Sequence, residues 1–436
     1  MRLALAGAVL ATVAGVTFVV LVAAIVLGLF DNPYAGLVVG IALPALLVLG
    51  LLLIPAGLWL GRRARAGQPD VSEEWPVIDF RLARVRRTTL MITALTVVNI
   101  VIVLLGTHGS LRWMESPGFC GQLCHTPMQP QFVAWRESAH AGTTCVQCHI
   151  GEGASAFVHA KLAGIRQLTH VMTNSYARPI PPGTEMAPGA QAERCLGCHQ
   201  PTVTGGDRIK VIRDYADDEA NSETATTLQI RVGAIHWHAN PANRVEYVAA
   251  DDTRETIPYV KVTRPNGEVR EYRTADATDQ AIRDGTRRTM DCIDCHNTVG
   301  HTIAPSAERA VDDAIAAGRV SRQLPHARRE SVRLMKASYA GEAAEAIDRE
   351  FRGFYRSRGG EIDEHAVART VAALQALYRR NVFPDMKVTW GSYPDNRGHI
   401  TATGCFRCHD DSHSDTSGAV IKADCETCHT QIAAAP

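Results

Sequence analysis

Five segments of the chain repeat the pattern Cys-x-x-Cys-His. The chain has 436 residues with 12 Cys and 17 His, and a random sequence of this composition would contain about 0.01 copies of the pattern. The five copies are Cys145/Cys148/His149, Cys195/Cys198/His199, Cys292/Cys295/His296, Cys405/Cys408/His409 and Cys425/Cys428/His429. In such a motif the two thiols form thioethers to the vinyl groups of a haem, and the adjacent His becomes an axial ligand of the iron.

Zinc sites and disulfides are the alternative interpretations of so many paired cysteines. A zinc site would need two such pairs close together, and it would not need a His directly after each pair. Disulfides would not need the His either. Because every one of the five pairs carries its His, the pattern indicates five covalently bound c-type haems.

A sixth pair departs from the pattern. In "FCGQLCHTPMQP", Cys120 and Cys124 enclose three residues instead of two, and His125 and Met128 follow. These two cysteines are the last of the 12. The extra residue must bulge if both sulfurs are to reach one haem, so a pair of thiols without haem is the alternative. We expect a sixth haem with unusual ligation.

The remaining histidines could supply the second axial ligands. Two imidazoles hold iron six-coordinate and leave no open position, which suits electron transfer better than substrate chemistry. His159 and His170 are eleven residues apart and share one face of a helix, whereas His236 and His238 share one side of an expected strand. The distal candidates are His140, His170, His236, His238, His301, His399 and His413. We expect mostly bis-His haems.

Three apolar runs at the N-terminus predict a membrane anchor. Residues 3–30 and 34–60 carry no charge and are long enough to cross a bilayer, and residues 90–105 form a third, shorter run. The Arg-rich loop 61–87 places that segment in the cytoplasm by the positive-inside rule. The N-terminus is then cytoplasmic, and the chain after Gly106 lies in the periplasm of a multi-pass protein of the bacterial cytoplasmic membrane, where haem attachment also belongs.

The exported part predicts an α+β fold. Residues 209–215, 226–235 and 244–250 are rich in strand-forming residues, and Asn266-Gly267 within 257–273 signals a β-hairpin. Residues 306–318, 329–355 and 363–380 have helical apolar spacing. We therefore expect an α+β multihaem domain with a β-rich module on three membrane helices. Its parts are 1–106 (membrane anchor), 107–200 (haems 1–3), 201–291 (β-rich module) and 292–436 (helical domain, haems 4–6).

The segment "MESPGFCGQLCHTPMQPQFVAWRESAHAGTTCVQCHIGEGA" resembles the NapC/NirT family of membrane-anchored multihaem cytochromes. Within that family the chain is most similar to the ImcH-like inner-membrane branch, and "GAIHWH", "MDCIDCHNTVGH" and "GCFRCHDDSH" extend the similarity toward the C-terminus. The resemblance implies that the first haem lies at the membrane surface and takes a Met ligand. One extra residue separates the motif from Met128, so the ligand is His125 or Met128.

The resemblance also implies a quinol dehydrogenase. The family uses a Lys, often with an Asp, on the helix after the second haem motif, and Lys161 occupies the Lys position. No Asp follows on that helix, so His159 or His170 would accept the protons. Membrane quinol would be the substrate, and periplasmic cytochromes or a reductase would accept the electrons.

Two other functions stay open from the sequence. One is a terminal reductase subunit, although the Cys-x-x-Cys-Lys motif of ammonia-forming nitrite reductases is absent. The other is an electron-relay subunit of a larger respiratory complex. The formal net charge is zero, and the propionates of six haems would add about a dozen negative charges. We expect the lipid bilayer as a partner and no nucleic acid.

Overall fold

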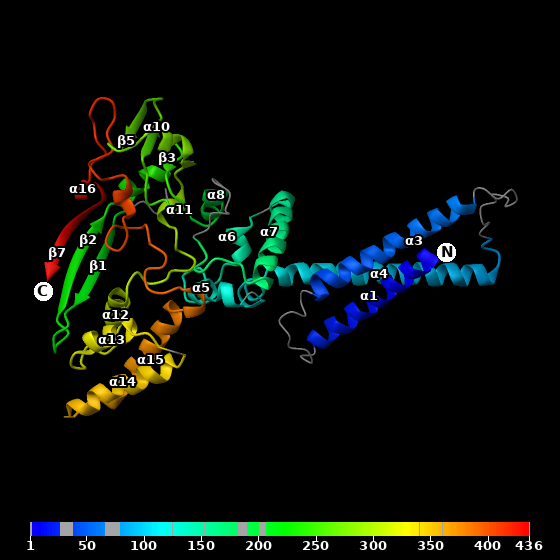
Figure 1. The fold of residues 1–436 in the computed structure, drawn as a ribbon, viewed down its shortest axis with the longest axis horizontal. Helices are drawn as coiled ribbons and strands as arrows, with labels where there is room; N and C mark the ends of the chain where they lie inside the picture. The colour runs from blue at the N-terminus through cyan, green and yellow to red at the C-terminus, as the bar shows by residue number, and fades with distance from the viewer. Residues whose placement is uncertain are drawn as a thin grey trace. The chain divides into compact units, whose positions relative to one another are not determined.

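The computed structural model describes residues 2–26, 38–65, 79–123, 125–151, 153–181, 190–199, 206–339, 341–359 and 361–435. The chain forms two compact units, residues 1–123 and residues 124–436. The first unit is helical, and the second combines helices with two β-sheets (Figure 1). This confirms the expected mixture of α and β structure. The two units are described one after the other.

The first unit contains three long helices. They are α1 (Arg2–Val26), α3 (Leu43–Arg65), which follows the short π-helix η1 (Val38–Ala42), and α4 (Ala83–Met114). Helices α1 and α3 pack antiparallel through small residues. A Cβ atom at Gly57 would lie 2.4 Å from the Ala4 nitrogen, and one at Gly50 would lie 2.6 Å from the Ala11 nitrogen. Such close approach of backbones is typical of membrane helices.

Two helical stretches of this unit are long and apolar enough to cross a membrane, Leu3–Val22 and Val38–Gly61. The expected third span lies inside α4, a continuous helix of 32 residues. It is not confirmed, because the two stretches above are the ones among the described residues that are long and apolar enough to cross a membrane. Residues 66–78 of the expected cytoplasmic loop lie outside the described residues.

Four helices precede the sheets in the second unit. They are α5 (His125–Arg136), α6 (Cys145–His149), α7 (Ala154–Met172) and α8 (Ala190–Leu196). The π-helix η2 (Phe119–Leu123) leads into them from the end of the first unit. Both α6 and α8 are short and coincide with cysteine motifs. Helix α7 is the long member of the group.

The first sheet joins the β-rich segment to the end of the chain. Its antiparallel strands are β1 (Arg208–Tyr215), β2 (Glu223–Ile230) and β7 (His429–Ala435), in the order β1-β2-β7 (Figure 1). Strand β7 was not expected, because residues 292–436 were assigned to a helical domain. It begins at the His of the last cysteine motif, and His429 pairs with Ile230.

The strand predicted over residues 226–235 ends early. Strand β2 stops at Ile230, and α9 (Val232–Ile235) and the 3₁₀-helix η3 (His236–Ala239) follow. The prediction that His236 and His238 lie on a strand and face one side is therefore wrong. Residues two apart on a 3₁₀-helix point about 240° apart. The chain turns here because Arg231 donates its backbone N–H to the Cys428 carbonyl and Ile235 donates back to Arg231.

The second sheet has four strands in the order β5-β4-β3-β6. They are β3 (Arg244–Ala249), β4 (Tyr259–Thr263), β5 (Val269–Arg273) and β6 (Thr286–Thr289). The hairpin predicted at Asn266-Gly267 is confirmed, with Gly267 at φ +82° and its N–H donated to the Arg264 carbonyl. Helix α10 (Asp279–Asp284) precedes β6, and α11 (Cys292–Cys295) follows it.

Four helices form a compact group that we call the helical subdomain, residues 307–381. They are α12 (Ala307–Ala316), α13 (Ala327–Lys336), α14 (Ala343–Arg358) and α15 (Glu364–Asn381). Ser306 caps α12 and Asp363 caps α15. The apolar faces meet in a core that includes Val311, Leu334, Ile347, Phe351 and Leu374. Three short elements follow, η4 (Pro384–Met386), η5 (Gly404–Arg407) and α16 (Cys425–Cys428).

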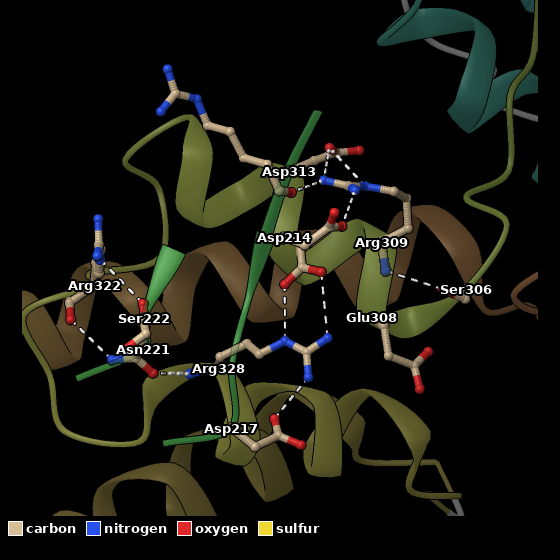
Figure 2. A network of polar contacts seen from close by, with 12 residues as sticks. Asp214, Asp217, Asn221, Ser222, Ser306, Glu308, Arg309, Asp313, Arg322 and Arg328 are labelled. Atoms are coloured by element: carbon tan, nitrogen blue, oxygen red, sulfur yellow. Dashed lines mark hydrogen bonds and ion pairs between the residues drawn. The ribbon is translucent and has the colours of Figure 1, made fainter. Parts of the chain in front are cut away.

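A polar network attaches the helical subdomain to the β1–β2 hairpin (Figure 2). Asn221, in the hairpin turn, donates from its side-chain amide to the carbonyls of Arg322 and Leu324, both at 2.9 Å. It also accepts the backbone N–H of Arg328 at 2.9 Å. The Arg328 guanidinium in turn binds Asp312 at 3.0 Å and Asp217 at 2.8 Å. The hairpin is thereby fixed to α12 and α13.

Candidate haem-binding sites

The first cysteine of each of the five regular motifs lies in a short helix. In the four motifs after α6, the His donates its backbone N–H to the carbonyl of the first Cys: His199 to Cys195, His296 to Cys292, His409 to Cys405 and His429 to Cys425. Aspartates cap two of the turns: Asp291 accepts from Ile293 at 3.0 Å, and Asp424 accepts from Glu426 at 3.1 Å. One turn places cysteines three residues apart on the same face. Two thiols can therefore reach one flat ligand.

The two cysteines of the motif Cys195/Cys198/His199 differ in exposure. Cys195 is half-buried, whereas Cys198 is exposed. The reason is that α8 ends at Leu196, so Cys198 lies in the turn after the helix, where its backbone N–H donates to the Cys195 carbonyl at 3.1 Å. Cys148 and Cys425 are exposed in the same way. The thioether role of Cys198 stays a prediction, and the protein itself does not enclose this thiol.

Every one of the five motif histidines faces a second histidine. The ring centres of these pairs lie between 5.9 and 6.3 Å apart. The pairs are His149 with His301, His199 with His140, His296 with His236, His409 with His238, and His429 with His399.

The spacing of these pairs fits a metal ion between the two rings. Bonds from a metal to an imidazole nitrogen are about 2 Å long, so two imidazoles on opposite sides of one iron have ring centres about 6 Å apart. The separation therefore suits two axial ligands of one haem iron.

Hydrogen bonds orient several of these rings toward their partners. The Nδ1 atoms of His140, His238 and His409 lie 3.3, 2.9 and 2.9 Å from the carbonyl oxygens of Val299, Ile235 and Lys422 respectively. A histidine that binds a metal commonly donates its other N–H to a backbone carbonyl. The contact leaves Nε2 available for the iron.

Burial favours the uncharged form of these imidazoles. It lowers the pKa of His301 to about 4, with a smaller contribution from the neighbouring His149. It also lowers the pKa values of His238 and His296. A neutral imidazole keeps the nitrogen lone pair that a metal bond needs.

Three predicted site histidines do not face a motif histidine. His413 is fully buried, with Nδ1 2.9 Å from an Asp410 oxygen and Nε2 2.7 Å from the Ile257 carbonyl, so both ring nitrogens have protein partners. His170 lies near the end of α7 with Nδ1 2.8 Å from the Ser175 hydroxyl. His159 lies on the same helix, and both α7 histidines are exposed.

Each regular motif contacts the next regular motif along the chain, beginning with Cys145/Cys148/His149 and Cys195/Cys198/His199. Arg194, which precedes Cys195, donates to the carbonyls of Cys148 and Ile150, the latter at 3.1 Å. The thiols of Cys195 and Cys292 are hydrogen-bond partners. The remaining motifs continue this series.

The third and fourth regular motifs are joined by an arginine inside the fourth. The Arg407 guanidinium donates to the Asp294 carbonyl at 2.7 Å and to the Arg254 carbonyl at 3.0 Å. Cys428 lies near Cys405, so the last motif lies beside the fourth. Each of the five regular motifs therefore lies beside the next one along the chain, and we call this series the row of motifs. Sequence reasoning missed the bridging roles of Arg194 and Arg407, although both lie in or directly beside a motif.

A buried charged cluster lies beside the third regular motif. The Asp294 carboxylate is 1% exposed, and it accepts hydrogen bonds from the Tyr247 hydroxyl and from Arg254, the latter at 2.9 Å. Nearby, Arg288 Nε and one Asp291 oxygen are buried without a hydrogen-bond partner in the described part of the chain. Burial raises the pKa of Asp291. The Arg288 guanidinium, with a buried donor that has no hydrogen-bond partner, suits a carboxyl group of a bound haem.

The irregular pair lies partly within a π-helix. Cys120 belongs to η2 (Phe119–Leu123), and Cys124 follows directly but lies outside the described residues, as does the side chain of His125. A π-helical turn contains one more residue than an α-helical turn. Cysteines four apart on such a turn can face the same way, as cysteines three apart do on an α-helical turn. Met128 lies on α5 and is half-buried.

Lys161 occupies the middle of α7. Its ammonium group lies 4.9 Å from the centre of the Phe157 ring, one turn earlier on the same helix. Its side chain is partly exposed. The described residues contain no group of three or more His, Cys, Asp or Glu side chains that could hold a bare metal ion together.

Comparison with known proteins agrees with this geometry. Residues 83–179 match the N-terminal region of the NapC/NirT cytochrome c family. The chain is also similar to the cytochrome c-type protein ImcH of Geobacter sulfurreducens (strain ATCC 51573 / DSM 12127 / PCA), with 36% identity over 447 residues that cover 99% of this chain and 87% of that protein. No solved structure gives a significant match.

Proposed function

The chain belongs to the family of the cytochrome c-type protein ImcH, and from this premise we propose that it oxidises quinol in the bacterial inner membrane and passes the electrons through six c-type haems to periplasmic acceptors. Family membership itself establishes a membrane-anchored c-type cytochrome that carries covalent haem and acts in electron transfer. The observation that carries the proposal is the set of five histidine pairs, each built on one Cys-x-x-Cys-His motif.

The pairs favour electron transfer over substrate reduction. Bound haem would supply the one-electron chemistry, and the ten paired histidines would fill both axial positions at five irons. A filled coordination sphere leaves no place for a small substrate. This supports an electron carrier over a terminal reductase for these five sites.

The row of motifs supports a single route through the protein. Arg194 and Arg407 hold neighbouring motifs together, and the motifs follow one another in chain order from Cys145 to His429. We assign the exit of electrons to the last motif, Cys425/Cys428/His429, since it lies at the far end of this row. The acceptor would be a periplasmic cytochrome or a reductase.

The entry of electrons is assigned to the sixth haem, held by Cys120 and Cys124. The π-helical turn at Cys120 supports this assignment, because a turn with one more residue would suit a pair of cysteines that encloses three residues. Its position just after α4 places it near the bilayer if α4 is the third span, and quinol stays in the bilayer. Either His125 or Met128 would bind the iron.

The proposed quinol site includes Lys161, with His159 and His170 on the same helix α7. Quinol oxidation releases protons, and these side chains can hydrogen-bond a quinol oxygen or accept a proton. In the proposed topology the N-terminus and the Arg-rich loop are cytoplasmic, and the chain after α4 is periplasmic.

A reductive titration tests the proposal as a whole. The purified full-length protein in detergent is treated with a quinol analogue under anaerobic conditions, and visible and EPR spectra are recorded. We expect reduction by quinol without a partner protein and six haem additions in the intact mass. Five additions would show that Cys120 and Cys124 carry no haem. Reduction only in the presence of another subunit would favour a relay role.

Substitution of Lys161 tests the quinol site. Lys161→Leu should slow reduction by quinol while haem content and reduction by dithionite stay unchanged. Lys210→Leu, at an exposed position on β1, is the matched control and should have no effect. Met128→Leu should alter the spectrum of a single haem if Met128 is the ligand, and an unchanged spectrum would assign His125.

A further inference from the structure

Helix α7 carries a stripe of large apolar side chains on its exposed face. The side chains of Val158, Leu162, Ile165 and Met172 are 52%, 61%, 59% and 79% exposed. Their spacing of four, three and seven residues places them on one face of an α-helix. We call these four residues the α7 stripe. An exposed, contiguous apolar surface of this kind marks an interaction site.

The opposite face of α7 is the one that turns toward the protein. Phe157, Ala160, Ala163, Leu168 and Val171 are half-buried, whereas the stripe is exposed throughout. A surface helix of a soluble domain normally turns its apolar face inward and its polar face outward. Helix α7 has apolar residues on both faces, so the stripe is not explained by packing within the described part of this chain.

The polar groups of the helix are arranged around the stripe. Thr169 lies within it, and its hydroxyl donates to the Ile165 carbonyl at 3.0 Å, so that no unsatisfied polar group interrupts the apolar surface. Lys161 and Arg166 lie about 60° and 80° to either side of the stripe, counting 100° per residue. The helix contains no Asp or Glu. An apolar face bordered by basic residues is typical of helices that lie in a membrane interface.

We propose that α7 lies in the interface of the lipid bilayer, with the α7 stripe inserted among the acyl chains and its basic residues beside anionic headgroups. Chain continuity favours lipid over a protein partner. The chain up to Leu123 forms the unit that contains the membrane helices, and α7 starts at Ala154, a short way along the next unit. The haem domain is therefore held to a bilayer surface permanently, which raises the effective concentration of lipid around α7.

This second attachment would restrict how the haem domain turns above the membrane. Apolar helices in the first unit only tether it, whereas a helix embedded along its length also fixes which face looks at the bilayer. The inference rests on membrane anchoring and does not depend on quinol being the substrate. It goes beyond the proposed quinol role of Lys161 because it assigns the neighbouring apolar side chains of the α7 stripe to lipid.

Photolabelling of the full-length protein tests the inference. The holoprotein is placed in nanodiscs of phosphatidylglycerol doped with a phospholipid that carries a diazirine in its acyl chain. After illumination, labelled peptides are identified by mass spectrometry. We expect lipid adducts on Leu162, Ile165 or Met172 in addition to those on α1 and α3. The Leu162→Glu, Ile165→Glu double variant should reduce α7 labelling at least about tenfold, since two large apolar side chains leave the stripe.

Matched controls separate lipid contact from simple exposure. Ile209 and Val211 on β1 are 60% and 46% exposed, and they should remain unlabelled. The Ile209→Glu variant should leave α7 labelling unchanged, and all variants should keep the haem spectrum of the parent protein. The inference is overturned if α1 and α3 are labelled and α7 is not, or if α7 crosslinks to a second protein chain in place of lipid. Neither outcome bears on quinol oxidation, which is measured separately by the titration above.

Discussion

The helical subdomain and the segments that carry the cysteine motifs are held together in different ways. In the helical subdomain, residues 307–381, interlocking side chains such as Phe351, Ile347 and Leu374 are completely buried. Between Trp135 and Asp214, where two motifs lie, no hydrophobic side chain of the described residues is buried. The motif turns are instead tied by hydrogen bonds from Arg194 and by facing histidines.

This contrast indicates what fills the segments that carry the cysteine motifs. A folded domain normally buries a close-packed core of side chains, and the described residues between Trp135 and Asp214 lack one although their backbone follows defined turns. Cys198 is an example, because its thiol is exposed although it belongs to a motif. Covalent haems placed between the histidine pairs would supply apolar surface at the motif turns, whereas the α7 stripe is assigned to lipid. On this view one region has a core made by side chains and the other a core made by its cofactors.

The strongest test removes the cofactors altogether. If the chain is produced in a host that lacks cytochrome c maturation, we expect the segments 140–199 and 399–429 to lose most of their protection against hydrogen exchange. Helices α12 to α15 should keep theirs, because their core needs no haem. Mass-resolved hydrogen exchange on matured and unmatured protein measures both regions at once. Equal loss of protection in the helical subdomain would show that the two regions do not differ in this way.

Loss of one distal histidine should have the next largest effect. His301→Ala removes the partner of His149 and should convert one haem to a high-spin, five-coordinate form, which visible and EPR spectra detect. The other haems should keep their spectra. His413→Asn is the control, because both nitrogens of His413 are engaged by protein atoms. A high-spin signal in the control variant would contradict the pairing described here.

A cavity in the side-chain core should affect stability and leave the haems alone. Phe351 is fully buried among the helices of the subdomain, and Phe351→Ala should cost about 3–5 kcal/mol in the free energy of unfolding of that region. Denaturant titration followed by far-ultraviolet circular dichroism measures the loss. The haem absorption spectrum should not change, and a spectral shift would mean that the two regions are more tightly coupled than their cores suggest.

The smallest effect on stability is expected where the β1–β2 hairpin meets α12 and α13. Asp217 binds Arg328 at 2.8 Å, but its side chain is 60% exposed (Figure 2). Asp217→Asn should cost less than about 1 kcal/mol, since exposed ion pairs contribute little. Asn221→Ala should cost clearly more, because it leaves the buried Leu324 carbonyl, the part-buried Arg322 carbonyl and the Arg328 N–H without their partner. Thermal unfolding of the two variants side by side gives the comparison.

Much of the site could be predicted from the sequence because it depends on residues that are close together in the chain. The five Cys-x-x-Cys-His motifs, the apolar helices at the N-terminus and the hairpin at Asn266-Gly267 depend on residues a few positions apart. The same is true of α12 and α15, whose caps Ser306 and Asp363 lie directly before them. Local spacing decides which backbone turns form and which thiols can share one ligand.

Only the tertiary structure decided which histidine faces which. His301 follows the third regular motif in sequence but faces His149 of the first, and His140 precedes the first but faces His199 of the second. Strand β7 likewise returns to β2 from the far end of the chain. The sequence also did not predict that His236 and His238 lie on a 3₁₀-helix. This placement lets His236 face His296 and His238 face His409, which belong to two different motifs. Residue types and local periodicity do not predict such long-range pairings. The same motifs allow many arrangements, and the packing and hydrogen bonds of distant segments select one of them.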